Sequence, residues 1–368
     1  MKILYLGGFE LPDKNAAAHR VMANAKLLRE MGFDVSFIGI SKDLKNAPHE
    51  VDAFVSNPIS YPTSIKKWLK QIISFVDEGV IIKEHPDYVV LYNFPSIASL
   101  SIIHMCHNMG IKVICDLTEW EQIKGYSPRT LIKKCDIWLR MHYCIAKMDG
   151  VIAISKFLYN YYKGKTNCIY MPPTVDLQDP KWNRTRTLVS HDKVQLIYAG
   201  TGKGAGNKDR LDFVIESIRG KTNMELTVIG MTEEQYQQDY GKVLPNDAII
   251  HFKGRVPHHE AIRAVQNSDF QMLIRPSNLK NNAGFPTKLV ESVTCCTPLI
   301  ATVTSNICDY IQDGVHGFIV SDQCSLEDVI KRIDKLPKEK IIEMKDSCRK
   351  IYSFDYRTYK EELSKLFN

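Results

Sequence analysis

Short apolar segments alternate with amphipathic segments along almost the whole chain. The apolar segments have the length of β-strands, and helical patterns lie between them. This alternation predicts β–α–β units with parallel strands, whose two faces are covered by helices. The predicted strands are 2–7, 34–40, 88–93, 112–118, 150–155 and 168–171 in the first half, and 194–200, 226–230, 249–254, 270–275, 298–302 and 317–320 in the second.

The segment after the first strand shows the clearest helical pattern. Val21, Met22, Ala25 and Leu28 recur at the spacing of one helix face. Gly32 stands where the C-terminal cap of such a helix is expected. The sequence therefore predicts a β-strand, a tight turn and a helix at the start of the chain.

The chain is expected to form two domains. Its 368 residues are too many for one ordinary core. Pro172 and Pro173 interrupt the pattern, and the polar stretch 178–193 follows. We therefore expect one domain over 1–172 and a second over 173–354. The tail, 355–368, has a helical pattern again.

Composition narrows the class of protein. A content of 44% hydrophobic and 24% charged residues is typical of a soluble globular chain. The ten cysteines include no CxxC pair, which favours reduced thiols in a cytoplasmic protein. The opening MKILYLGGF predicts a first strand rather than a signal peptide. A net charge of +6 suits a small anionic ligand or an anionic membrane better than nucleic acid.

A glycine-rich loop follows the first strand of the second half. Four glycines alternate with other residues before a helix that begins near Lys208 and Asp209: Gly200, Gly202, Gly204 and Gly206. Glycines let the backbone approach a diphosphate, and amides at a helix N-terminus favour anions. Lys208 adds a positive charge. The alternative is a flexible turn with a solvated lysine.

The segment AGFPTKLVES, 283–292, carries a second set of polar groups. Lys288 and Glu291 are three positions apart, on one face of a short predicted helix. A carboxylate accepts two hydrogen bonds from vicinal hydroxyls, which suits Glu291 to a ribose. Lys288 is placed to reach a diphosphate. The alternatives are a solvent-facing glutamate and a local ion pair between the two side chains.

These segments together resemble the retaining glycosyltransferases of family 4, which have the GT-B fold. The resemblance implies an α/β protein with two Rossmann-like domains facing across a cleft, and a C-terminal helix that crosses back to the first domain. The family has two glutamates in this segment. The second matches Glu291, and the first falls on Ala283. The backbone amides of Gly284 and Phe285 remain as expected donor-binding groups.

The resemblance extends to other turns. The family's turn that reads the nucleobase matches 252–256, with Arg255 near the phosphates. The turn at Gly7 and Gly8 matches one that faces the acceptor and the donor diphosphate. His19 follows at a helix start and is a candidate for the acceptor site. The alternatives are a surface role for Arg255 and no role for His19.

A pair of acidic residues follows the fourth predicted strand. Asp116 and Glu119 are next to Trp120. Carboxylates accept hydrogen bonds from sugar hydroxyls, and an indole covers an apolar sugar face. Asp116 and Glu119 are therefore candidates for acceptor binding or proton transfer. The alternative is a turn in which an acidic side chain caps a helix.

We expect no catalytic metal and no cofactor. The sequence has no Asp-x-Asp motif and no His or Cys cluster with zinc spacing. Family members usually neutralise the leaving diphosphate with basic side chains and helix dipoles instead.

The resemblance implies a hexosyltransferase that uses a nucleotide-sugar, with UDP favoured over GDP as the carrier. The acceptor is expected to be a glycan or a lipid-linked glycan in surface polysaccharide assembly, and the sugar's anomeric configuration to be retained. Two alternatives remain: a sugar-nucleotide epimerase of the same fold, and a catalytically silent subunit, which Ala283 suggests. Measuring UDP release with and without an acceptor would separate them.

A helix predicted at 130–148 suggests peripheral attachment to the inner face of the cell membrane. Lys133, Arg140 and Lys147 recur every seven residues and would form one basic stripe. The expected neighbours of the stripe are Ile137, Met141 and Cys144, and the expected core-facing residues are Leu131, Cys135, Trp138 and Leu139. A basic stripe flanked by apolar residues is suited to lipid headgroups, whereas solvated charges are the alternative.

Overall fold

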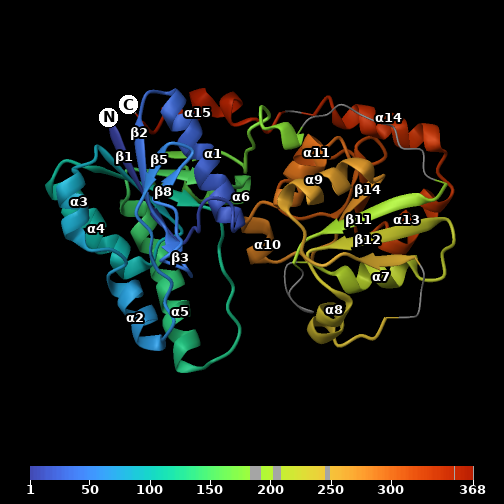
Figure 1. Ribbon diagram of the computed structural model, residues 1–368, viewed down its shortest axis with the longest axis horizontal. Helices are drawn as coiled ribbons and strands as arrows, with labels where there is room; N and C mark the ends of the chain where they lie inside the picture. Colours follow the sequence, from blue (N-terminus) through green and yellow to red (C-terminus); the bar gives the residue numbers. More distant parts are fainter. Residues whose placement is uncertain (183–191, 202–208, 245–248, 352, 368) are drawn as a thin grey trace. The chain divides into compact units, whose positions relative to one another are not determined.

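The chain folds into two units, each built around its own parallel sheet (Figure 1). The computed structural model describes residues 1–182, 192–201, 209–244, 249–351 and 353–367. The first unit comprises Met1–Asp176, Ala283–Phe285 and Asp355–Asn368, and the second comprises Leu177–Asn282 and Pro286–Phe354. The division falls after Asp176, shortly beyond the expected boundary at residue 172.

The sheet of the first unit has the strand order β10-β9-β8-β7-β1-β2-β5-β4. Neighbouring strands are parallel except for β4 and β5, which are antiparallel. The strands are β1 Lys2–Gly7, β2 Asp34–Ile38, β4 Glu50–Val51, β5 Phe54–Ser56, β7 Tyr88–Tyr92, β8 Lys112–Leu117, β9 Gly150–Ala153 and β10 Cys168–Tyr170, and a separate pair joins β3 Ile40–Ser41 to β6 Ile59–Ser60.

Helices connect these strands, and the first is the one that the sequence predicts. It begins after Asn15, whose side chain accepts a hydrogen bond from the Ala18 amide, and Gly32 follows its end at φ +91°. The helices are α1 Ala16–Glu30, α2 Ile65–Ile73, α3 Glu78–Glu84, α4 Ser96–Asn108, α5 Pro128–Leu139, the π-turn η1 Arg140–Cys144, the 3₁₀ turn η2 Ile145–Lys147, α6 Lys156–Tyr162, the 3₁₀ turn η4 Tyr356–Tyr359 and α15 Lys360–Ser364.

The sheet of the second unit is parallel throughout, with the order β13-β12-β11-β14-β15-β16. Its strands are β11 Val194–Ala199, β12 Met224–Ile229, β13 Ile250–Phe252, β14 Phe270–Leu273, β15 Leu299–Thr302 and β16 Gly317–Val320. Its helices are the 3₁₀ turn η3 Pro180–Trp182, α7 Leu211–Ile218, α8 Glu233–Tyr240, α9 His258–Asn267, α10 Leu279–Ala283, α11 Thr287–Thr294, α12 Ile307–Tyr310, α13 Leu326–Asp334 and α14 Lys338–Cys348.

The strand order reverses direction once in each sheet. In the second unit the chain builds outward from β11 to β13 on one side and from β14 to β16 on the other. In the first unit the corresponding neighbours are β1 and β7. Ligands of such sheets bind at the carboxyl ends of the two strands that flank the reversal. The expected parallel α/β architecture is confirmed, and candidate sites are located at β11/β14 and β1/β7.

The C-terminal tail groups with the first unit, as the family resemblance implies. Leu363, Leu366 and Phe367 are buried in its core. The Phe367 ring lies 5.8 Å from that of Phe33 and 5.0 Å from that of Tyr88. Large apolar side chains therefore hold this short segment against the sheet.

The predicted orientation of the helix at 130–148 is wrong. Ile137, Met141 and Cys144 are buried, whereas Leu131 and Trp138 are exposed. Arg140, expected in the basic stripe, is buried, and its guanidinium donates to the carbonyl oxygen of Asn93 at 3.1 Å. The helix is also interrupted at Arg140–Cys144, where a π-turn replaces the α-helical spacing.

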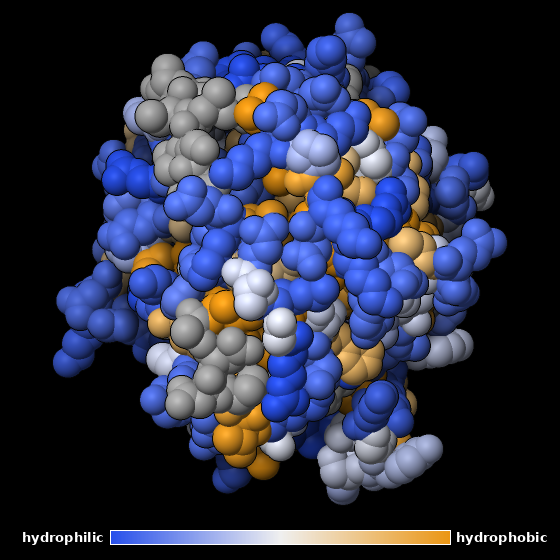
Figure 2. Space-filling view, turned by 90° about the vertical axis from the view of Figure 1, so that its right-hand side faces the viewer, coloured by the Kyte–Doolittle hydropathy of each residue, from blue (hydrophilic) through white to orange (hydrophobic). Residues whose placement is uncertain are grey.

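No helix in the described part of the chain combines the length and the apolar character that crossing a bilayer requires. The face of the molecule shown in Figure 2 is mainly hydrophilic, and its hydrophobic residues lie in small patches.

Candidate active site

A buried ionic cluster lies at the carboxyl ends of β11 and β14. The carboxylate of Asp209, just before α7, accepts a hydrogen bond from Arg275 Nε at 2.6 Å and another from the Tyr198 hydroxyl at 2.8 Å. Lys288 Nζ, on the first turn of α11, also donates to Asp209. The amide of Arg210 donates to the Ile274 carbonyl at 2.7 Å, which fixes the start of α7 beside the end of β14.

The Lys288 side chain can occupy its position because residue 200 is glycine. A Cβ atom at Gly200 would lie 2.6 Å from Lys288 Nζ, closer than two such atoms can approach. The ammonium group also lies 3.9 Å from the centre of the Tyr198 ring, an arrangement typical of a cation–π contact. The turn after β11 and the lysine of α11 are therefore matched to each other, which neither sequence segment shows by itself.

The cluster stays charged although it is buried. Burial alone would raise the pKa of Asp209, but the positive charges of Lys288 and Arg275 outweigh it and hold that pKa well below its ordinary value. Burial lowers the pKa of Lys288, and the charge of Asp209 opposes this effect. The site therefore presents two cations that already bind one anionic group.

Glu291 lies one helical turn beyond Lys288 on α11 and is partly buried. Burial raises its pKa to about 7, although the charge of Lys288 and the nearby side-chain amide of Gln271 favour the ionised form. Gln271 is fully buried in β14. A carboxyl group in this position can accept two hydroxyl hydrogen bonds once it is ionised.

The other predicted donor-binding residues are more widely spread. Arg255 is exposed in the turn between β13 and α9. Gly284 and Phe285 lie between α10 and α11 in the short segment that groups with the first unit. Lys208 lies outside the described residues. The structure thus brings Lys288 and Glu291 together with Asp209 and Arg275, neither of which the sequence identified as a donor ligand.

Ala283 is buried where the family resemblance places the first glutamate. Its carbonyl oxygen accepts a hydrogen bond from Ser155 Oγ at 2.6 Å, within the first unit. Any contact that the family's glutamate makes to a donor sugar must come from other groups in this chain.

Asp116 is fully buried in the first unit, inside β8. Its carboxylate accepts hydrogen bonds from Arg20 Nε at 2.8 Å, from the Tyr5 hydroxyl at 2.5 Å and from Asn24 Nδ2 at 3.2 Å. A side chain with no exposed surface does not reach an acceptor in this arrangement. The geometry favours a role for Asp116 in positioning, and its catalytic role stays a prediction.

Arg20 extends this network to the end of the first unit's sheet. Its guanidinium donates to the carbonyl oxygens of Met171 and Pro172 at 3.0 and 3.2 Å. The network therefore connects α1 and β8 to the residues that follow β10. The sequence signal was an arginine in the helix after β1 together with an acid at a strand end, but their pairing across 96 positions is not visible in a pattern.

The remaining first-unit candidates lie at the carboxyl ends of its strands. Glu119 is partly exposed just after β8, and His19 is partly exposed on the first turn of α1. Gly8 is exposed next to Gly7, where a Cβ atom would lie 2.6 Å from the Tyr92 carbonyl oxygen. These positions agree with an acceptor-facing edge, while the individual roles stay predictions.

Trp120 belongs to a group of aromatic side chains at this edge. Its ring centre lies 4.9 Å from Tyr161, 5.5 Å from His142 and 6.4 Å from Phe157. The Tyr161 hydroxyl and His142 Nδ1 are 2.9 Å apart. Rings from the loop after β8, from η1 and from α6 therefore pack together beside Glu119 in the chain.

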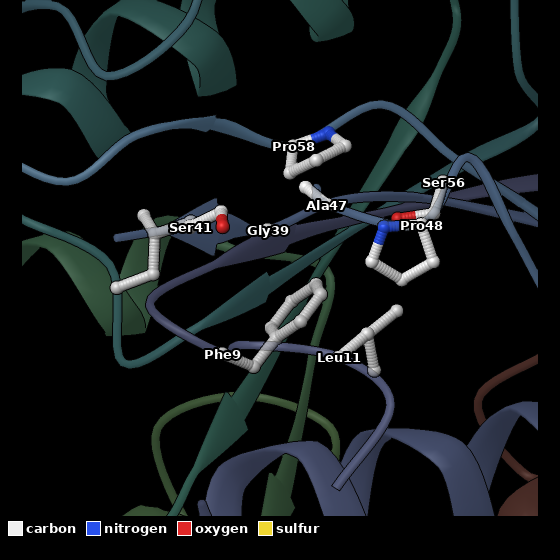
Figure 3. Close-up of a pocket in the computed structure, with 9 residues that line it drawn as sticks. Phe9, Leu11, Gly39, Ser41, Ala47, Pro48, Ser56 and Pro58 are labelled. Atoms are coloured by element: carbon white, nitrogen blue, oxygen red, sulfur yellow. The ribbon is translucent and has the colours of Figure 1, made fainter. Parts of the chain in front are cut away.

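A small cavity elsewhere in the first unit lacks the groups for this chemistry. Phe9 and Leu11, from the loop after β1, face Ala47, Pro48 and Pro58 across it (Figure 3). Its lining residues include serines but no charged side chain. Among the residues that the structure describes, no group of three His, Cys, Asp or Glu side chains is arranged to hold a metal ion.

Comparisons with known proteins agree with this geometry. Residues 183–352 match the family model "Glycosyl transferases group 1". The structure is similar to sucrose-phosphate synthase from Thermosynechococcus elongatus (TM-score 0.70, 13% identity, covering 100% of this chain and 98% of that one). It is also similar to HepE from Anabaena in complex with UDP and glucose (TM-score 0.66, 12% identity, covering 99% and 98%).

A third similar structure is the lipopolysaccharide outer core galactosyltransferase WaaB (TM-score 0.62, 15% identity, covering 100% and 99%). A search of curated proteins found no matching sequence. The chain thus has the GT-B fold of two Rossmann-like domains. The similarity to the group 1 glycosyltransferases covers residues 183–352, most of which lie in the second unit.

Proposed function

We propose that the protein is a retaining hexosyltransferase that moves a sugar from a UDP-sugar to a glycan or lipid-linked acceptor. The observation that carries the proposal is the site on α11, where Lys288 and Glu291 stand one turn apart at the carboxyl ends of β11 and β14. This site lies within the residues that match the glycosyltransferase family. The GT-B neighbours are consistent with it, because a transferase of this fold acts on a bound nucleotide-sugar.

In this proposal the donor's ribose hydroxyls bind the ionised carboxylate of Glu291, and its diphosphate lies toward Lys288. The leaving diphosphate gains negative charge as the sugar departs, and nearby cations stabilise that charge. Arg255 and Lys208 are further candidates for this role. Lys208→Ala should weaken UDP binding more than uridine binding, because only the diphosphate needs the positive charge.

UDP is favoured as the carrier because structures of two of the similar proteins hold uridine nucleotides. One is HepE with UDP and glucose, and another is an Escherichia coli trehalose-6-phosphate structure with UDP-2-fluoro glucose. Retention of configuration is expected by attack of the acceptor hydroxyl on the face from which the diphosphate leaves. Glu119 and His19 are candidates to contact that hydroxyl. Assembly of a surface polysaccharide on the cytoplasmic side of the membrane is the proposed setting.

The experiment is a turnover assay with a panel of UDP-sugars and GDP-sugars, with and without a lipid-linked glycan extract. The proposal predicts nucleoside diphosphate release that rises when the extract is added, and product in which the anomeric configuration is retained. Transfer should continue in EDTA, because no metal is expected to participate. Loss of transfer in EDTA that Mg²⁺ restores would contradict that expectation.

The buried Ala283 supports one alternative, a catalytically silent subunit that binds nucleotide-sugars. That alternative predicts tight UDP-sugar binding without any UDP release above the buffer rate. An epimerase would interconvert the sugar of the UDP-sugar without an acceptor. The three outcomes are distinguished by one set of reactions analysed for both UDP and sugar identity.

A further inference from the structure

Two helices of the first unit begin at the same end of that unit. In Figure 1, α2 and α5 lie side by side. The guanidinium of Arg129, on the first turn of α5, lies 5.1 Å from the centre of the Trp68 ring on α2, and Lys133 Nζ lies 5.9 Å from it. The N-terminal turns of α2 and α5, together with the residues just before them, are called the α2/α5 tip below.

The charge of the α2/α5 tip has one sign. Segments 61–76 and 122–135, which contain α2 and most of α5, include no Asp or Glu. Their basic residues are Lys66, Lys67, Lys70, Lys124, Arg129, Lys133 and Lys134. Neither helix has an acidic residue in its first turn, so the positive ends of both helix dipoles add to this charge. An anionic surface would therefore be attracted to the tip.

The tip also exposes large apolar side chains. Ile65 is 61% exposed at the start of α2, and Tyr126 is 85% exposed just before α5. Leu131 and Ile132 follow on α5, and both are exposed. In the amphipathic helix α2, Ile72 is buried and Trp68 and Leu69 are partly buried, whereas Ile65 and Ile73 at its two ends are exposed.

We propose that the α2/α5 tip docks on an anionic membrane surface. Aliphatic side chains can enter the boundary between headgroups and acyl chains, aromatic rings suit the headgroup level, and lysines pair with anionic lipids. A nucleic-acid site requires cations but not exposed isoleucine and leucine, and a protein interface of this kind is usually depleted in lysine. The combination of charge and apolar exposure therefore favours a bilayer.

The tip lies on the functional side of the first unit's sheet. Residues 118–127 lead from the end of β8 to the start of α5, and α5 leads back to β9, which is parallel to β8. The tip is therefore on the side where the strands end, together with Glu119 and Trp120. Resting on the proposed function, this placement brings a lipid-linked acceptor toward the edge that is expected to receive it.

The test is co-sedimentation of the full chain with vesicles of phosphatidylcholine alone and of an equal mixture of phosphatidylcholine and phosphatidylglycerol. One variant carries Lys66→Gln, Lys67→Gln and Arg129→Gln, and a second carries Ile65→Ser and Tyr126→Ser. The charge-matched control carries Lys331→Gln, Lys338→Gln and Lys340→Gln, at exposed positions of the second unit.

The wild-type protein and the control should bind the mixed vesicles and be released at high salt. The basic variant should lose about a hundredfold in partition coefficient, because each cation near an anionic surface contributes about fivefold. The apolar variant should also bind the mixed vesicles more weakly than the wild type, although its charge is unchanged. Equal partition to both vesicle types, an equal loss in the control, or equally tight binding of duplex DNA would overturn the proposal.

Calorimetry with UDP-glucose on the same variants separates this proposal from the proposed function. The basic and apolar variants should bind UDP-glucose as the wild type does, because their substitutions lie outside the second unit. Vesicle binding by a protein that transfers no sugar would leave the docking surface standing and remove the enzymatic proposal.

Discussion

Lys288 and Glu291 differ in how burial affects them, although they are neighbours on α11. Lys288 keeps a partner, because Asp209 accepts its hydrogen bond. Glu291 has its pKa raised to about 7, since burial outweighs the charge of Lys288. At the residue scale, the proposed donor site therefore contains one cation that is held in place and one carboxyl group whose pKa is raised to about 7.

This titration predicts a pH-dependent donor affinity. If ribose hydroxyls bind the ionised carboxylate of Glu291, as proposed, donor affinity should fall as the pH drops below about 7. Between pH 8 and pH 6 the loss should be about tenfold, because one proton is taken up. The measurement is calorimetric titration with UDP-glucose, whose phosphates are both esterified and do not titrate in this range.

Glu291→Gln provides the comparison for the pH series. It should bind UDP-glucose more weakly at pH 8, and its affinity should not change with pH, since the glutamine side chain does not titrate in this range. Glu327→Gln, at an exposed position of α13, should keep the wild-type profile. A wild-type affinity that is constant from pH 6 to pH 8 would contradict the role of Glu291.

The pH dependence that Glu291 gives to folding stability is opposite in sign to the one expected for donor affinity. The folded-state pKa of Glu291 lies above that of an unfolded glutamate, so its contribution to stability is present at low pH and is lost as the pH rises through about 7. The site thus trades stability at neutral pH for a carboxylate that can bind the donor.

Asp116 should matter for folding. Replacement by asparagine removes the charge that compensates the buried guanidinium of Arg20. Breaking a buried pair by removing one partner costs about 3–5 kcal/mol, which Asp116→Asn should show in urea-induced unfolding. Glu119→Gln, at a partly exposed position, should change the free energy of unfolding by less than about 0.5 kcal/mol.

The outcome for Asp116 also distinguishes the two readings of its role. A stable Asp116→Asn protein that has lost transfer would support the catalytic prediction instead.

The sequence could suggest Lys288 and Glu291 because they share one short helix. It could not show that Asp209 and Arg275 join them, since these residues meet only when α7 and β14 are placed side by side.

At the scale of elements, the strands were the most predictable part. Long buried strands such as β1, β7 and β8 are mainly apolar, because helices cover both faces of a parallel sheet. The short strands β4 to β6 were missed, and β3 was merged with β2 in one predicted strand, since two or three residues give no periodicity. Helix α5 was predicted, but its buried face was assigned wrongly, because apolar residues lie on two of its faces.

Polar partners decided which face of α5 is buried. The Asp136 carboxylate accepts from the amide and the hydroxyl of Ser96 at the start of α4, both at 2.8 Å. The Arg140 guanidinium donates to Asn93. These contacts turn Ile137 inward with its charged neighbours and leave Trp138 outside. A rule that places charges outside cannot find this arrangement.

The C-terminal tail offers a test at this scale. Phe367→Ala removes a buried ring that packs on Phe33 and Tyr88. The expected loss is about 3–5 kcal/mol in the free energy of unfolding of the first unit. Urea denaturation followed by near-UV circular dichroism would measure it. Ile82→Ala, at an exposed position of the same unit, should cost far less, and equal losses would contradict the packing described here.

At the scale of the whole molecule, each unit has its own sheet, core and reversal of strand order. The sequence predicted this organisation because the alternation of strands and helices continues through both halves and is interrupted near Pro172. It also suggested that the tail returns to the first unit, through the family resemblance. The proposal places donor binding on the second unit, and acceptor and membrane contacts on the first.

The central claim is that the site on α11 binds a nucleotide-sugar. Calorimetric titration of UDP into the wild type, Glu291→Ala and the control Glu260→Ala, which lies on the exposed side of α9, tests it most directly. Glu291→Ala should weaken binding by about 1.5–3 kcal/mol, the loss of hydrogen bonds to a charged group, while the control keeps wild-type affinity. No binding of UDP to the wild type, or equal affinity in Glu291→Ala, would contradict the account.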